Sequence, residues 1–289
     1  MRPIHLSLST IPPRFNDLGK TLGSLLQQSA KIDSLTVYVP KNYRRFPDHT
    51  FCLPDVPDGV SVEVVDDDLG PATKILPAVK RFRGQDVDLL FCDDDRFYEP
   101  GWAARFIEAR NSHPDECLCN SGILLDHPKH ITGANYFGGK KPRAQLAGGI
   151  HKLEYRLARL KQMLKERRIS IPAAEKPERI LFSKSGYVDM FEGYGGVMVK
   201  PDQFDDTAFE LPETVWMVDD VWLSGNLEKM GVKIWLMGKW KFSPHPFTGD
   251  DSALYKAIIE GINREQANLA CVKYVQDAFG VWVDSTVPD

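Results

Sequence analysis

The chain has 289 residues, of which 43% are hydrophobic and 26% charged, which is the composition of an ordinary globular protein. A net charge of -4 at pH 7 excludes the overall basic field that attracts nucleic acid, so we expect no nucleic-acid partner. No window approaches the roughly 20 apolar residues of a membrane span, the start lacks a signal peptide, and five scattered cysteines predict free thiols and a cytoplasmic location.

The first predicted strand is Ile4–Ser9, where apolar and polar residues alternate. A rigid loop follows it, because Pro12 and Pro13 can continue neither a helix nor a strand ladder. Leucines on one face predict a helix from Asn16, a good N-cap, to Ser29, and residues 35–39 form the next predicted strand. This order is typical of the start of an α/β nucleotide-binding unit.

A third strand is predicted over Val60–Val65, and an acidic run beginning at Asp66 follows it. A carboxylate at a strand end can accept hydrogen bonds from a ribose or a base. Lys74, expected in the first turn of the next helix, can reach a phosphate with help from the positive helix end. The alternative is a solvated acidic turn followed by a surface lysine.

Three consecutive aspartates follow the apolar run Leu89–Cys92, which predicts a strand covered on both faces. Such sheets bind ligands at the carboxyl ends of their strands, where Asp93, Asp94 and Asp95 would lie. Adjacent carboxylates repel one another, so a cation at this edge would be stabilising. Carboxylate oxygens suit Mg²⁺ or Mn²⁺, and the alternative is an acidic turn in water.

The middle of the chain contains a predicted helix from Pro100 to Ser112, a glycine-rich loop over residues 126–150 that is a lid candidate, and a helix over Lys152–Arg168. The last helix has a leucine stripe and a net charge of +5, from seven basic and two acidic residues. It either packs on the domain with a solvated outer face, or docks on an anionic membrane surface or a phosphorylated acceptor.

A second group of chemically interesting residues lies in the last third of the chain. Glu192–Gly196 is a glycine-rich turn before an apolar strand, where glycine either lets the backbone approach a ligand or only supplies positive φ. Asp219 and Asp220 open a predicted helix, where acids cap the helix or one of them acts as a general base. A strand over Val232–Met237 and a terminal helix from Asn263 to Gly280 complete the prediction.

Taken in order, these segments resemble the metal-dependent, family 2-like glycosyltransferases of the GT-A fold. Asp93–Asp95 followed by Tyr98 and Pro100 looks like their Asp-x-Asp motif, which ends a central strand and holds a metal on a nucleotide-sugar diphosphate. The string Leu-Gly-Pro-Ala-Thr-Lys at 69–74 and the helix end Ser24–Gln28 are also similar to patterns of these enzymes. The resemblance covers about residues 4–110 and 190–245.

The resemblance implies a GT-A-like, Rossmann-like α/β fold, with a mixed, mostly parallel sheet flanked by helices and a helical insertion. It implies one catalytic domain over residues 1–289. Within it, residues 1–115 form the nucleotide-sugar-binding half and 186–250 the acceptor and catalytic half, with an insertion over 126–185 and a helical tail over 251–289.

The implied reaction is transfer of a sugar, with inversion, from a nucleotide sugar such as a UDP-sugar to a glycan or lipid-linked acceptor. The implied cofactor is Mn²⁺ or Mg²⁺, held by Asp93, Asp95 and His245. The nucleotide-binding residues are Thr10, Arg14, Asp66, Lys74, Asp93 and Asp94, and the sugar and acceptor pocket consists of Glu192, Gly193, Tyr194, Gly195 and Gly196. Asp220 matches the general base of the family's Glu-Asp motif, and Asp219 stands where the family has Glu.

Two other classes of protein remain open. A sugar nucleotidyltransferase shares the strand-end acids and the metal, but usually has an N-terminal glycine-rich loop that the Pro12-Pro13 loop does not match. A non-catalytic sugar-binding module would not need Asp220.

Overall fold

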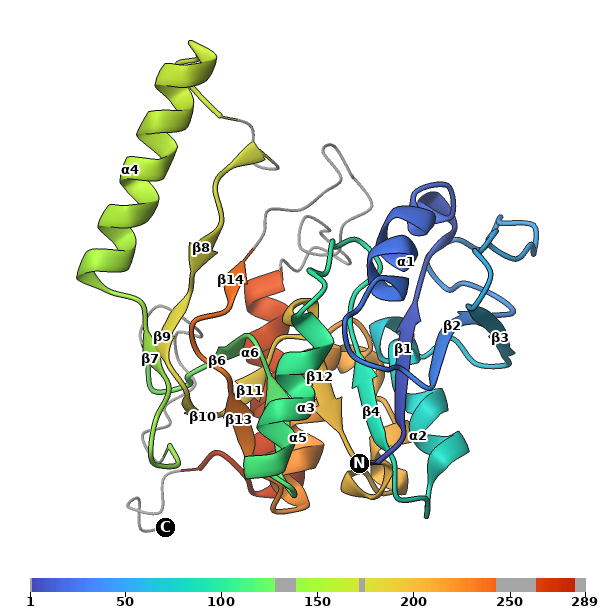
Figure 1. Cartoon of the computed structure of the whole chain (residues 1–289). Helices are drawn as coiled ribbons and strands as arrows, with labels where there is room; N and C mark the ends of the chain where they lie inside the picture. Colours follow the sequence, from blue (N-terminus) through green and yellow to red (C-terminus); the bar gives the residue numbers. More distant parts are fainter. Residues whose placement is uncertain (1, 128–138, 172–174, 243–263, 284–289) are drawn as a thin grey trace.

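The computed structural model describes residues 2–127, 139–171, 175–242 and 264–283 (Figure 1). His245 and Asn263 of the sequence analysis lie outside the described residues. The centre of the molecule is an eight-stranded sheet in the order β10-β13-β5-β12-β4-β1-β2-β3.

The first half of the chain forms the parallel part of this sheet. The strands β1 (Ile4–Ser9), β2 (Ser34–Pro40), β3 (Ser61–Val65) and β4 (Asp88–Phe91) lie side by side in parallel, with β1 between β2 and β4. All four were predicted from the sequence, and the carboxyl ends of β1 and β4 reach the same edge of the sheet.

The rest of the chain completes the sheet with mixed directions. β12 (Val197–Val199) is antiparallel to β4 and to β5 (Cys117–Cys119), while β13 (Ile234–Leu236) is parallel to β5 and antiparallel to β10 (Gly186–Val188). The predicted mixed α/β sheet is therefore confirmed.

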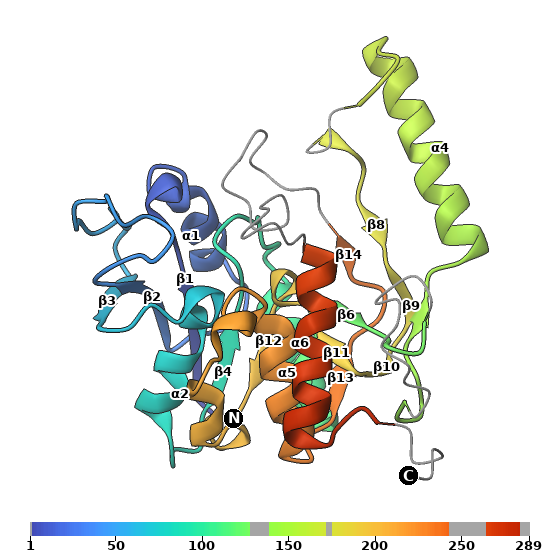
Figure 2. The same cartoon turned by 180° about the vertical axis from the view of Figure 1, so that it is seen from behind.

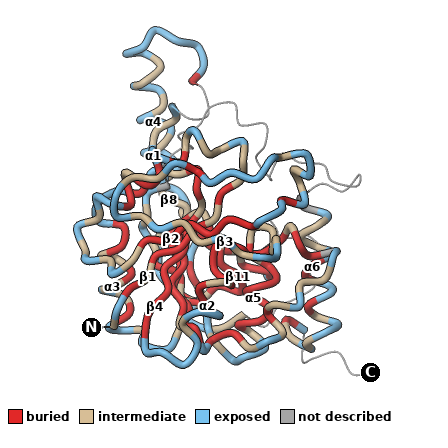
Figure 3. The backbone as a smooth tube through the Cα atoms, turned by 90° about the vertical axis from the view of Figure 1, so that its right-hand side faces the viewer, coloured by how far each residue is buried: buried red, intermediate tan, exposed pale blue. Residues whose placement is uncertain are grey.

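Helices cover both faces of the sheet, as Figures 1 and 2 show. On one face, α1 (Leu18–Leu26) and α3 (Trp102–Ser112) bury leucines and aromatic residues in a core shared with β1 and β2. On the other face, α2 (Leu76–Phe82), α5 (Asp219–Lys229) and α6 (Arg264–Phe279) share a second core with β12 and β13. In Figure 3 the central strands β1, β2 and β4 are mostly buried between these two layers, whereas β3 at the edge of the sheet is exposed or half-buried.

One helix was expected to begin earlier than it does. Lys74 ends a separate 3-10 helix, Gly70–Lys74, and α2 begins only at Leu76. Pro77 lies in the first turn of α2, and in one continuous helix its ring would clash with a carbonyl of the preceding turn. Lys74 therefore does not lie in the first turn of α2 as predicted.

The remaining elements extend from one side of the sheet. Three short two-stranded pairs join β6 (Gly122–Ile123) to β11 (Met190–Phe191), β7 (Gln145–Leu146) to β9 (Phe182–Lys184), and β8 (Arg179–Ile180) to β14 (Lys241–Phe242). The long helix α4 (Gly149–Glu166) lies between β7 and β8 along the chain and corresponds to the predicted basic helix. Part of the predicted 126–150 loop lies outside the described residues, and none of the helices described is long and apolar enough to cross a bilayer.

Candidate active site

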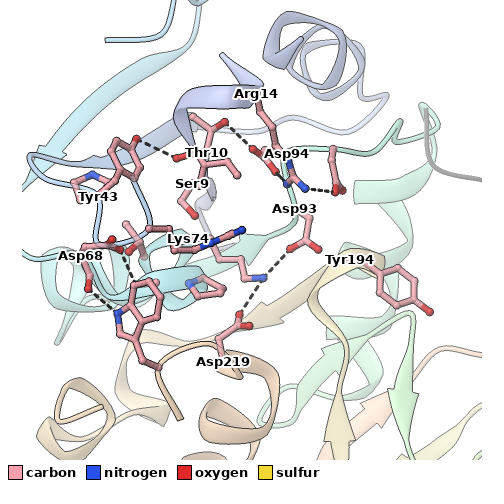
Figure 4. A pocket seen from close by; sticks show the side chains of 18 of the residues that line it. Ser9, Thr10, Arg14, Tyr43, Asp68, Lys74, Asp93, Asp94, Tyr194 and Asp219 are labelled. Atoms are coloured by element: carbon pink, nitrogen blue, oxygen red, sulfur yellow. Dashed lines mark hydrogen bonds and ion pairs between the residues drawn. The ribbon is translucent and has the colours of Figure 1, made fainter. Parts of the chain in front are cut away.

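A cavity of about 350 Å³ lies at the carboxyl ends of β1 and β4. This volume is within the range of roughly 300–1,000 Å³ that is usual for small-molecule sites. Its walls include predicted residues from both halves of the chain, namely Thr10, Arg14, Lys74, Asp93, Asp94, Asp95, Glu192, Tyr194, Asp219 and Asp220. Figure 4 shows how several of these side chains converge.

Arg14 holds two of the three consecutive aspartates. Its guanidinium lies 2.6 Å from an oxygen of Asp94 and 3.1 Å from an oxygen of Asp95. The Thr10 hydroxyl also donates a hydrogen bond of 2.6 Å to Asp94. Burial raises the pKa of Asp94 to about 6, although Arg14 opposes that shift. The loop that two prolines make rigid therefore contributes directly to the charge balance of the cavity.

Lys74 connects the third aspartate to the second half of the chain. Its ammonium group donates to Asp93 at 2.7 Å and lies 3.0 Å from a carboxylate oxygen of Asp219 (Figure 4). Lys74 is only 6% exposed. Burial disfavours its charge, but Asp219, Asp93 and Asp220 outweigh this effect and raise the pKa of Lys74 well above its ordinary value. The cavity therefore contains a permanent buried cation.

Asp220 is oriented by the glycine-rich turn. The backbone N–H of Gly193 donates a hydrogen bond of 3.0 Å to Oδ1 of Asp220. A Cβ atom at Gly193 would lie 2.8 Å from the Lys74 ammonium nitrogen and 3.1 Å from Oδ1 of Asp220, so a side chain at this position would displace both groups. Gly196 has a φ of +91°, and a Cβ atom there would meet the Trp102 ring at 2.3 Å. The two glycines are thus required by close contacts.

A second acidic residue of the β3 loop, Asp68, lines the cavity, whereas the predicted Asp66 is exposed, is not among the lining residues and pairs with Lys41. Asp68 accepts hydrogen bonds from the backbone N–H groups of Gly70 and Arg44, both at 2.8 Å. Burial raises the pKa of Asp68. The spacing Asp-x-Gly is a turn signature that could have singled out Asp68 in the sequence.

Aromatic residues that the sequence analysis did not select complete the cavity near Asp68. The Trp216 indole donates to the Asp68 carbonyl at 2.9 Å, and the Tyr43 hydroxyl donates to the Thr10 carbonyl at 3.1 Å. Both residues line the cavity, so this end offers flat apolar surfaces beside a carboxylate. No motif marks them, because they lie in loops between the predicted elements.

The opposite end of the cavity is formed by Glu192 and Tyr194. The Ser121 hydroxyl donates to Glu192 at 2.6 Å and lies 2.7 Å from the Tyr194 hydroxyl. The Arg96 guanidinium lies 4.9 Å from the centre of the Tyr194 ring, within the range of a cation–π contact. Ser121 was missed because it follows β5, a three-residue strand without a recognisable period.

Two of the cavity's carboxylates could take part in metal binding. Among the described residues, no group of three or more His, Cys, Asp or Glu side chains is arranged to hold a metal ion. Mg²⁺ and similar ions often use only one or two carboxylates, together with waters and substrate phosphates. Asp93, which is partly exposed, and Asp95 fit that smaller donor set, while His245 lies outside the described residues.

The chain is similar to solved structures of TarS from S. aureus. The structure of TarS 1-349 has a TM-score of 0.43 at 11% identity, over 96% of this chain and 72% of that one. TarS 1-349 in complex with UDP has a TM-score of 0.41 at 11% identity, over 82% of this chain and 58% of that one. A further TarS structure has a TM-score of 0.39 at 12% identity, over 84% of this chain and 37% of that one. The chain thus spans less than two thirds of the last two. No protein-family model and no curated protein sequence matches it.

Proposed function

We propose that the protein is a metal-dependent glycosyltransferase that moves a sugar, with inversion, from a nucleotide sugar to a glycan or lipid-linked acceptor. The observation that carries this proposal is that two basic side chains, Lys74 and Arg14, converge in one cavity with the carboxylates of Asp93–Asp95 and Asp220. A diphosphate needs positive charge, and an acceptor hydroxyl needs a base. The cavity offers both.

The donor would lie along the β1, β3 and β4 ends of the cavity. Lys74 and Arg14 supply fixed positive charge for the diphosphate of a UDP-sugar. Asp68, with Tyr43 and Trp216 beside it, would contact the base or ribose, a role that the sequence analysis gave to Asp66. Asp93 and Asp95 would hold Mn²⁺ or Mg²⁺, which when bound would offset the charge of the leaving diphosphate.

The acceptor would enter from the side of Glu192 and Tyr194. A hydroxyl that attacks the anomeric carbon must lose its proton, and in this proposal Asp220 accepts it. The Gly193 N–H holds one oxygen of Asp220, and this contact orients the carboxylate. Asp219, buried against Lys74, keeps that cation in place.

The test of the function is incubation of the protein with a panel of nucleotide sugars and Mn²⁺. We expect slow release of nucleoside diphosphate, with water acting as a poor acceptor. Pyrophosphate-dependent formation or cleavage of the nucleotide sugar would instead indicate a nucleotidyltransferase. Binding of a nucleotide sugar without any turnover, including with glycan acceptors, would indicate a sugar-binding module and would contradict the proposal.

The metal requirement is tested by changing Asp95 to alanine. We expect nucleotide affinity in Mn²⁺ to fall roughly tenfold or more, because a lost ligand weakens coordination and leaves the diphosphate charge uncompensated. In EDTA the variant and the original protein should bind alike. Titration calorimetry measures the affinity in Mn²⁺ and in EDTA. The control is Asp67→Ala, which changes an exposed aspartate outside the cavity. Equal affinities in Mn²⁺ would remove Asp95 from the metal site.

A further inference from the structure

Helix α4 stands away from the body of the protein. Figures 1 and 2 show it projecting past the carboxyl ends of β1 and β4, the end of the sheet at which the cavity lies. It is connected to the sheet through the short strands β7, β8 and β9. Over all of Gly149–Glu166, no residue is buried, and Figure 3 shows the helix in the colours of exposed and half-buried residues.

The apolar side of α4 faces solvent. Its large apolar side chains recur every three or four residues and therefore lie on one face: Ile150, Leu153, Leu157, Leu160 and Leu164. They are between 48% and 72% exposed. The half-buried residues lie on the opposite face, where Gln162 donates to the Glu175 carbonyl at 2.8 Å. The interpretation in which the leucines pack on the domain is therefore wrong.

Basic side chains border this apolar stripe. Arg156 and Lys161 are exposed on its two flanks, and Lys152 and Lys165 are exposed farther around the helix. The segment 152–168 has a net charge of +5 in a chain whose total is -4. Just beyond the helix, Ile169 is 95% exposed. The result is a helix with one apolar face and basic margins, about 27 Å long at 1.5 Å per residue.

The charge decides which partner this face fits. The spacing of three and four residues would also suit pairing with α4 of a second copy, but that would bring two copies of the +5 segment 152–168 together. An anionic bilayer instead offers the opposite charge to the margins and an apolar interior to the leucines. We propose that α4 lies in the headgroup region of a membrane rich in anionic lipid, with its leucine stripe inserted and its basic residues on the lipid phosphates and carboxylates.

This proposal is independent of the reaction proposed above, because it is tested without any donor or acceptor. Vesicles of phosphatidylcholine, with or without phosphatidylserine, are sedimented with the whole protein. We expect association with the anionic vesicles at low salt, little with the neutral ones, and release by high salt, which screens the charges.

Two sets of substitutions separate the contributions of charge and of the leucine stripe. Changing Arg156, Lys161 and Lys165 to Glu should weaken vesicle binding about a hundredfold or more. Changing Leu157 and Leu160 to Ser should also weaken vesicle binding. Because both leucines are exposed, thermal stability should not fall. The matched control changes exposed lysines elsewhere, Lys31, Lys80 and Lys273, to Glu, with the same change in net charge and little expected loss of binding.

Three results would overturn the proposal. The first is that the original protein does not sediment with anionic vesicles at low salt. The second is that the α4 and control charge variants lose binding equally. The third is that light scattering shows a dimer, which the leucine substitutions dissociate, while vesicle binding is absent. The last result would assign the leucine stripe to a second copy of the chain.

Discussion

Changing Lys74 to methionine is expected to lower the free energy of unfolding by about 3–5 kcal/mol, the usual effect of removing one partner from a buried ion pair. The side chain of Asp219 is only 3% exposed, so without the ammonium group its charge would be buried and uncompensated. Binding of a nucleotide sugar should be lost as well, because the cavity loses a fixed cation. Urea unfolding and titration calorimetry measure the two effects.

The matched control is Lys80→Met, which removes an exposed lysine from α2 and should change neither quantity much. A second variant separates stability from binding. Changing Lys74 to Met together with Asp219 to Leu should recover part of the lost stability, since apolar replacements of both partners are often tolerated. It should not recover binding. An unchanged unfolding free energy in the single variant would show that water, and not Lys74, compensates Asp219.

Changing Asp220 to asparagine is expected to lower turnover by roughly a hundredfold or more, the scale of a lost general base. Asparagine keeps an oxygen that can accept the hydrogen bond from Gly193, so the turn should stay in place. It cannot accept a proton from an acceptor hydroxyl. Donor affinity and melting temperature should therefore remain close to the original values, while release of nucleoside diphosphate slows.

Asp206→Asn is the control, because Asp206 lies in the first turn of another short helix, outside the cavity. Should Asp220 only stabilise the start of α5, both substitutions would lower the melting temperature slightly and turnover would not change. That pattern would remove the general base from the proposed mechanism and leave the cavity as a binding site.

The sequence predicted those parts of the fold and of the candidate site that depend on a local pattern of residues. In the first half of the chain, predicted strands and helices alternate, so the four parallel strands and the position of Asp93–Asp95 at a strand end could be predicted. The same holds for Asp220 at the start of α5, where acidic residues precede an apolar helix. These features depend on residues that are close together along the chain.

Features that depend on distant parts of the chain could not be predicted in this way. The Lys74 ammonium is buried because Asp219, far away in sequence, packs against it. An acidic run such as Asp66–Asp68 does not reveal which carboxylate turns inward, since that depends on Trp216 and the β2 loop. Similarly, the period of α4 gives its apolar face but not the direction of that face, and here it faces solvent.

The place of β4 in the sheet has a consequence for the order of folding. β4 pairs with β1 on one side and with β12 on the other, and all four of its residues are buried. A chain emerging from the ribosome can pair β4 with β1 early, but its other edge stays open until Val197–Val199 has been made. An open apolar edge can pair with other chains. The segment carrying α4 lies between these two strands in sequence, so it prolongs the interval during which the nascent chain is exposed to aggregation.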